Sequence, residues 1–147
     1  MRAQGPGMRV IIRRIPGRRP HRVQGAGEVT HVAVLNIGGA LLVSIPSHLD
    51  EEAVVSLQEE LSAQIVDRAA HGVVIDITAL DVVDTFVGRR LSTIASLAHI
   101  LGARPVLVGM RPAVALTLVQ LGVDLEGVAK AADLEAGLRA LQESSAT

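Results

Sequence analysis

The stretch GVVIDITALDVVDTFV, residues 72–87, holds the element from which the rest of the fold follows. Residues 73–77 are an almost unbroken β-branched run, which is typical of a strand covered on both faces. A loop with two carboxylates, Asp81 and Asp84, comes next. Apolar side chains then recur at helical spacing from residue 87, and Gly102 ends that helix as a C′ glycine does. The stretch therefore predicts a buried strand, a polar loop and an amphipathic helix.

Towards the N-terminus the pattern predicts a hairpin and another helix. Residues 31–35 and 40–45 are short apolar runs, and Asn-Ile-Gly-Gly at residues 36–39 is a turn signal between them. Ser47 offers an N-cap, and acidic residues follow it where the positive end of a helix favours them. Apolar residues then recur every three or four positions until residue 71, at Val54, Leu57, Leu61 and Ile65.

Towards the C-terminus the alternation of strand and helix continues. Residues 105–108 predict another buried strand, and Pro112 stands where a helix begins. Residues 123–129 have a weaker pattern, with room for a short edge strand, and this interpretation places Lys130 in a loop. Asp133 offers a cap for a last helix.

The order of these elements predicts an α/β protein. A hairpin followed by strand–helix–strand units implies a mixed sheet of about four to five strands with about four helices. Right-handed crossovers would place the crossover helices together on the sheet.

The charges divide the chain into a basic arm and an acidic body. Residues 1–29 hold seven arginines against one glutamate, a charge of +6, so the net charge of −1 leaves −7 on the remainder. This composition predicts a disordered arm over residues 1–29, a folded domain over residues 30–142 and a frayed tail over residues 143–147. A basic arm can contact an acidic partner, and the simpler interpretation is a solvated tail.

The composition also excludes several classes of function. Phe86 is the only aromatic residue, so there is no platform on which nucleic-acid bases could stack. The absence of cysteine is compatible with a reducing cytosol. No apolar run approaches the roughly 18 residues that span a bilayer, and no signal peptide is visible. We expect a cytoplasmic protein that binds neither nucleic acid nor a membrane.

Catalytic and cofactor motifs are missing as well. The histidines lack HExxH spacing, and there is no GxSxG elbow, Walker lysine or GxGxxG loop. We therefore predict no enzymatic activity, no cofactor and no metal ion. One alternative stays open, because Asp76, Asp81 and Asp84 follow a strand end, where functional groups gather in open α/β sheets. Those carboxylates could bind Mg²⁺ or a nucleotide, although no phosphate-cradling loop accompanies them.

Thr85 stands at the junction between the polar loop and the helix. A hydroxyl there can face solvent, and the free N–H groups of a helix start favour an anion. A phosphate on Thr85 would add about −1.5 to −2 charge units, which any partner docked there would experience. The simpler interpretation is that Thr85 or Asp84 caps the helix.

Residues 32–141 resemble a STAS domain, the fold of anti-sigma-factor antagonists, and within it the RsbS and RsbR proteins of the stressosome. The segments that carry the resemblance are ALLVSI at 40–45, GVVIDIT at 72–78, VVDTFV at 82–87, GMRPAVALTLVQLG at 109–122 and DLEAGL at 133–138.

The resemblance implies a non-enzymatic scaffold and phospho-switch. It implies that an RsbT-like serine/threonine kinase phosphorylates Thr85, and that Asp81, Asp84 and Phe86 belong to the phosphoacceptor loop. Before phosphorylation the domain would sequester that kinase in a homo-oligomer or in a large assembly with RsbR-like STAS paralogues. Phosphorylation would release the kinase. Thr117 matches a second phosphorylatable position of RsbR-type chains.

Two departures from the pattern keep alternatives open. RsbS-type loops often carry serine where this chain has Thr85, and threonine is more typical of the RsbR type. RsbR proteins, however, have a large N-terminal sensor domain for which residues 1–30 are too short, so the RsbS branch is favoured. The alternative function is a stand-alone anti-anti-sigma factor that binds an anti-sigma kinase directly. Such proteins usually show Asp-Ser-Ser-Gly at this loop, where the present chain has DTFV.

Overall fold

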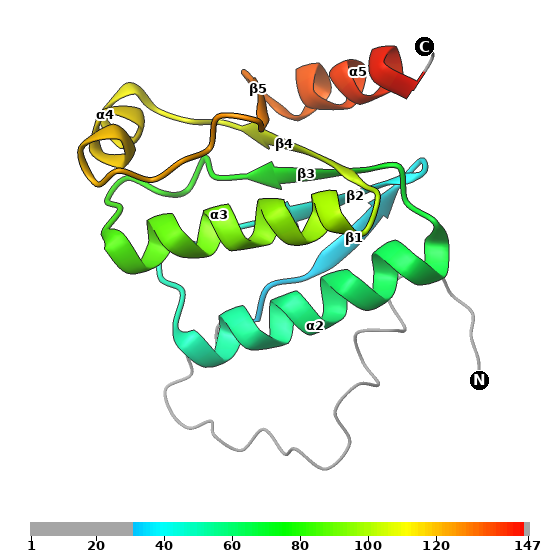
Figure 1. Ribbon diagram of the computed structural model, residues 1–147, viewed down its shortest axis with the longest axis horizontal. Coiled ribbons are helices and arrows are strands. Elements are labelled where there is room, and N and C mark those ends of the chain that lie inside the picture. The colour runs from blue at the N-terminus through cyan, green and yellow to red at the C-terminus, as the bar shows by residue number, and fades with distance from the viewer. Residues whose placement is uncertain (1–30, 146–147) are drawn as a thin grey trace.

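The computed structural model describes residues 31–145, which form a 5-stranded mixed sheet with helices on both faces (Figure 1). The predicted arm over residues 1–29 lies outside the described residues, as do residues 146–147 of the predicted tail. The first strand pair is antiparallel and the other pairs are parallel, so the predicted mixed α/β sheet is confirmed. In sheet order the strands are β1 (Val34–Ile37), β2 (Ala40–Ser44), β3 (Gly72–Asp76), β4 (Arg104–Val108) and β5 (Ala129–Ala131).

The helices of the described region are divided between the two faces of the sheet. In chain order they are α2 (Glu51–Arg68), α3 (Thr85–Ile100), α4 (Pro112–Gln120) and α5 (Leu134–Ser145). The three crossover helices, α2 to α4, bury their apolar residues in one cluster, and α5 packs against β3, β4 and β5 in the other (Figure 1). Because the strands follow one another in chain order, crossovers of one hand put their helices on a single face.

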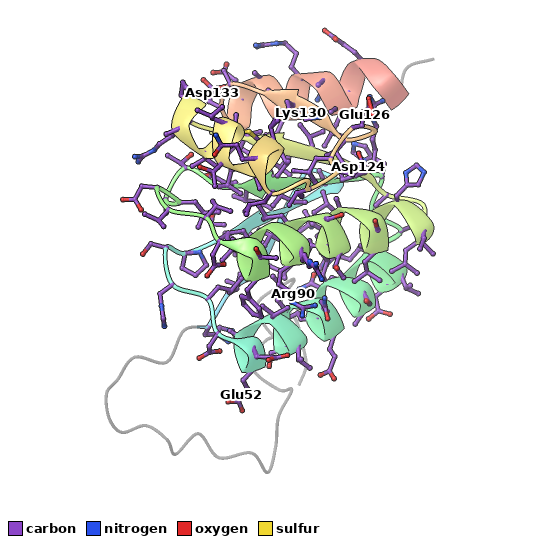
Figure 2. The ribbon with its side chains drawn as sticks, turned by 60° about the vertical axis from the view of Figure 1, so that its left-hand side comes forward. Glu52, Arg90, Asp124, Glu126, Lys130 and Asp133 are labelled. Atoms are coloured by element: carbon purple, nitrogen blue, oxygen red, sulfur yellow. The ribbon has the colours of Figure 1, made fainter. Side chains whose placement is uncertain are left out.

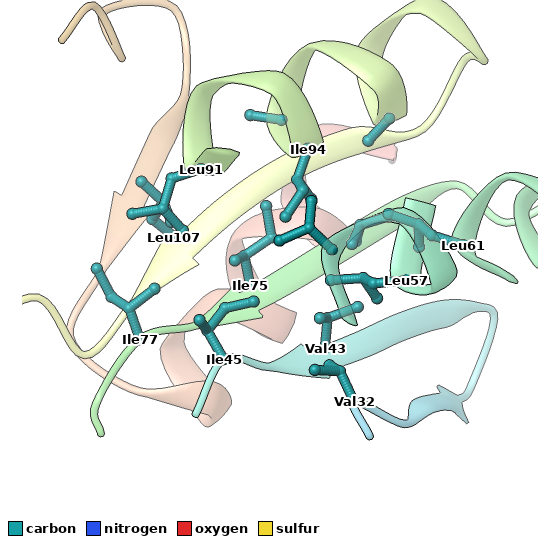
Figure 3. Close-up of a cluster of buried hydrophobic side chains, with 14 of the residues drawn as sticks. Val32, Val43, Ile45, Leu57, Leu61, Ile75, Ile77, Leu91, Ile94 and Leu107 are labelled. Atoms are coloured by element: carbon teal, nitrogen blue, oxygen red, sulfur yellow. The ribbon is translucent and has the colours of Figure 1, made fainter. Parts of the chain in front are cut away.

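The larger cluster is aliphatic and lies between β1 to β4 and the crossover helices. Its members include Leu57 and Leu61 of α2, Leu91 and Ile94 of α3, and Ile75 of β3 (Figure 3). Each of these side chains is at most 1% exposed. Burial of one such side chain contributes about 1.5–3 kcal/mol, so this cluster fixes the position of α3 and of the loop that precedes it.

The hairpin turn and the start of α2 differ from the sequence prediction. The turn contains only Gly38 and Gly39, with φ of +56° and +90°, so residues 36–37 belong to β1. Two consecutive residues with positive φ make the tight turn that matches the twist of a hairpin. The prediction of Ser47 as N-cap was wrong, because the carboxylate of Asp50 accepts the bond from Ala53 N at 2.8 Å and α2 begins after it.

The edge strand also lies later in the chain than predicted. Residues 124–128 are loop and turn, and Lys130, predicted in a loop, is the central residue of β5. Its backbone pairs with Leu107 of β4, while its ammonium donates to the carbonyl of Leu125 at 2.6 Å. The side chain thus fastens the loop to the strand, which the weak apolar pattern did not reveal.

Candidate functional site

The candidate site lies at the carboxyl edge of the parallel strands. The loop between β3 and α3 contains Asp81 and Asp84 and leads into Thr85, the first residue of α3. The loop between β4 and α4 runs next to it. The two loops are adjacent because β3 and β4 are neighbours in the sheet and both end at this edge.

Thr78 fastens the two loops together. Its backbone N–H and its hydroxyl both donate to Oδ1 of Asp76, at 2.9 and 2.6 Å, and its carbonyl accepts a bond from Nη2 of Arg111 at 3.1 Å. Gly109 lies against the same residue, since a Cβ at that position would touch the hydroxyl and the backbone of Thr78. The start of the loop that leads to Thr85 is therefore held by contacts at the ends of both β3 and β4.

Asp84 rather than Thr85 caps the helix. Asp84 is the N-cap of α3, and its Oδ1 accepts a bond from Val87 N at 2.9 Å. The backbone carbonyl of Asp84 accepts from Gly88 N at 2.9 Å. Thr85 is consequently the first residue of α3, and its side chain is exposed. Among the described residues its hydroxyl has no hydrogen-bond partner.

Phe86, the next residue of α3, packs against the larger cluster. Its ring is half-buried against the larger cluster, and the guanidinium of Arg90 lies over it, 5.1 Å from the ring centre. Figure 2 shows Arg90 between α3 and α2. The guanidinium of Arg89, one residue earlier, is exposed instead. Of the predicted loop residues, Phe86 is thus the one that anchors the helix.

The three predicted carboxylates do not form a common site. Asp76 is engaged with Thr78, Asp84 caps α3, and Asp81 is exposed in the loop between them. Within residues 31–145 no group of three or more histidine, aspartate or glutamate side chains comes together in a way that could hold a metal ion.

Thr117 belongs to the next helix along the chain, α4. It is in the middle of α4 and half-buried, and its hydroxyl donates to the carbonyl of Ala113 at 3.0 Å. Such a bond to the preceding turn is what a threonine within a helix usually makes.

Sequence reasoning missed two features of this region. One is Arg111, which could have been suspected because it directly follows the strand next to β3. The other is a groove of about 380 Å³ between α3 and the segment after α4. On α3 it is lined in part by Ser92 and Ser96, which in sequence resemble an ordinary solvated helix face, so no pattern indicated it.

The mixed sheet with its crossover helices on one face is the fold of a STAS domain. The family pattern of the STAS domain matches residues 31–131, and the chain belongs to this family. None of the described helices has both the length and the apolar character needed to cross a bilayer.

Solved structures of stressosome proteins resemble this chain over most of its length. RsbS from Moorella thermoacetica is 42% identical, with a TM-score of 0.72 over 80% of this chain and 100% of that one. A chain of the stressosome, described as a signal integration and transduction hub, is 42% identical, with a TM-score of 0.71 over 78% of this chain and 99% of that one. The predicted resemblance to STAS proteins of the stressosome is confirmed.

Curated relatives include proteins of the RsbR branch. RsbT co-antagonist protein RsbRA of Bacillus subtilis (strain 168) is 34% identical over 95 residues, which are 65% of this chain and 35% of that protein. The chain therefore spans about a third of the length of this relative.

Proposed function

We propose that this chain is a non-enzymatic scaffold and phospho-switch of a stressosome, an RsbS-like antagonist that sequesters an RsbT-type serine/threonine kinase. Phosphorylation of Thr85 releases that kinase. The observation that carries the proposal is the setting of Thr85 at the first residue of α3: its hydroxyl is exposed and has no hydrogen-bond partner within residues 31–145. A kinase can reach such a hydroxyl without unfolding the domain.

The likeness to whole stressosome chains supports the assembly. RsbS from Moorella thermoacetica is covered over its full length by this chain, and RsbRA carries the words "RsbT co-antagonist" in its name. We propose that RsbR-type STAS paralogues and an RsbT-type kinase are the partners, and that Asp81, Asp84 and Phe86 shape the loop that the kinase approaches.

The test is phosphorylation in vitro. The protein is incubated with the RsbT-type kinase of its source organism and ATP, and the phosphate is located by mass spectrometry. We expect one phosphate, on Thr85, and none in Thr85→Val. Thr117→Val serves as the matched control, since it removes the other candidate hydroxyl and should leave the phosphate count unchanged. Full modification at another residue would contradict the proposal.

Size-exclusion chromatography with light scattering tests the scaffold. Mixed with an RsbR-type paralogue, the protein should form a particle far larger than a dimer. A monomer or dimer that binds an anti-sigma kinase and never enlarges would favour a stand-alone anti-anti-sigma factor instead.

A further inference from the structure

The groove beside α3 lies on the same face of the helix as Thr85. From α3 it is lined by residues 7, 11 and 14 positions after Thr85, a spacing that returns to one face of a helix. These residues are Ser92, Ser96 and His99. The groove has a volume of about 380 Å³, and Leu125 and Val128 lie on its opposite wall.

The groove begins at Ser92, about two helical turns after Thr85. Gly88 packs so closely on the segment after α4 that a Cβ there would stand 2.8 Å from Cγ2 of Val123. Residues 124–128 then continue along α3 and form the far wall. The phosphoacceptor candidate and the groove are therefore neighbouring parts of one surface.

The rim of the groove is acidic. Asp124 and Glu126 lie on the segment above α3 (Figure 2). Oδ1 of Asp124 accepts a bond from Glu126 N at 2.9 Å, which fixes the turn, and among the described residues neither carboxylate has a basic partner. The ammonium of Lys130 binds the carbonyl of Leu125 and so is committed to the loop. The remaining titratable group of the lining is the exposed His99.

The floor of the groove suits an aliphatic stem. Ala95 is buried at its base, and Ile100, at one end, is 79% exposed although it is apolar. Lysine and arginine side chains lay their methylene groups on such surface and place the charged end on nearby carboxylates.

We propose that this groove is the docking site for a basic segment of the kinase that phosphorylates Thr85. The inference rests on the proposed function. A partner that binds specifically covers about 800 Å², a patch about 30 Å across, whereas the groove begins about 10 Å from Thr85 along the helix axis. A kinase that reaches Thr85 therefore extends over the groove, and the acidic rim selects a basic segment of it.

The protein offers a matched control on the other flank of α3. A second groove of about 330 Å³ lies between α2 and α3 and is lined by Glu59, Ser62 and Thr93 among others. Thr93 is eight positions after Thr85, which places it about 80° around the helix from that residue. Identical substitutions in the two grooves thus separate docking beside Thr85 from general effects of charge or bulk.

The experiment measures the dissociation constant of the RsbT-type kinase and, separately, phosphate on Thr85 at saturating kinase. Glu126→Lys and Ser96→Tyr alter exposed positions of the proposed groove, and Glu59→Lys and Ser62→Tyr are the controls. We expect each groove variant to weaken binding about tenfold and each control to stay within about twofold. Glu126→Lys should also reduce the salt dependence of binding.

The outcomes distinguish the two proposals. Groove variants that bind as tightly as their controls overturn the docking site, while phosphate on Thr85 keeps the proposed function. If the unaltered protein neither binds the kinase nor receives phosphate, both proposals are wrong. If the groove variants bind the kinase more weakly but still receive phosphate on Thr85 at saturating kinase, both the docking site and the proposed function are supported.

Discussion

Replacement of Gly109 by alanine tests how the loop before α3 is held. Gly109 has a φ of +80°, and a Cβ there would touch the hydroxyl of Thr78 and approach its backbone nitrogen to 3.0 Å. Two costs are therefore combined at this position: backbone strain and a steric clash. Gly102 provides the comparison, because its φ is +91° but a Cβ there would meet nothing within 4 Å.

The magnitudes follow from this difference. A positive φ costs a residue with a Cβ about 1–2 kcal/mol, and alanine recovers about 0.4–1 kcal/mol by restricting the unfolded chain. Gly102→Ala should therefore lower the free energy of unfolding by about 0–1.6 kcal/mol. Gly109→Ala adds overpacking of about 1–3 kcal/mol, for a total of about 1–4.6 kcal/mol.

Urea unfolding measures both values. With a slope of about 2 kcal/mol per molar urea, the midpoint should fall by about 0.5–2.3 M for Gly109→Ala and by about 0.8 M or less for Gly102→Ala. Gly127→Ala is the third variant: a Cβ there would meet nothing within 4 Å and its φ is not positive, so its midpoint should stay close to that of the unaltered protein. Equal midpoints for Gly109→Ala and Gly102→Ala would refute the steric contact with Thr78.

Three further predictions concern α3 and α4. Asp84→Ala should lower the free energy of unfolding by about 1 kcal/mol, because the N-cap bond of α3 is lost. Asp84→Asn should lower it by only a few tenths of a kcal/mol, because asparagine also caps helices. Thermal unfolding of both variants measures the two losses, and equal losses would contradict the role of Asp84 as the cap. Leu91→Ala should lower the free energy of unfolding by about 2–5 kcal/mol, because Leu91 is 0% exposed. Leu116→Ala, at a site 59% exposed, should change the free energy of unfolding by about 0.5 kcal/mol or less in the same urea titration. Similar values for the two variants would contradict the burial of Leu91. Thr117→Val should change the free energy of unfolding by about 0.5 kcal/mol or less, because its hydroxyl only bonds back to its own helix, and a larger loss would show that this hydroxyl supports the fold.

The elements with strong apolar periodicity could be predicted from the sequence. β3, α3, β4 and the start of α4 at Pro112 lie where the pattern placed them, because the central strand is buried on both faces and each helix has one apolar stripe. The boundaries that depend on a single backbone conformation could not be predicted from the sequence. Two successive glycines with positive φ shortened the hairpin turn, and β5 exists through its pairing with β4 rather than through its own composition.

The candidate site was predicted only in part. The sequence placed Asp84 and Thr85 at the start of a helix, but it left open which of them caps that helix, since both residue types can. It could not show that Arg111 binds the carbonyl of Thr78, because this contact joins residues 33 positions apart. The groove along α3 was equally inaccessible, since it requires the position of residues 124–128 relative to the helix.

The division of roles between Asp84 and Thr85 bears on how a switch at this site would act. Asp84 provides the cap of α3, and Thr78 holds the loop through bonds of its own, so the hydroxyl of Thr85 supports neither. A phosphate on Thr85 would therefore break no hydrogen bond within the described part of the chain, and the free N–H groups of the first turn favour its charge. It would instead add about −1.5 to −2 charge units close to Asp81 and Asp84. We accordingly expect the phosphate to act on a bound partner through the charge of this surface, with the fold of the domain unchanged.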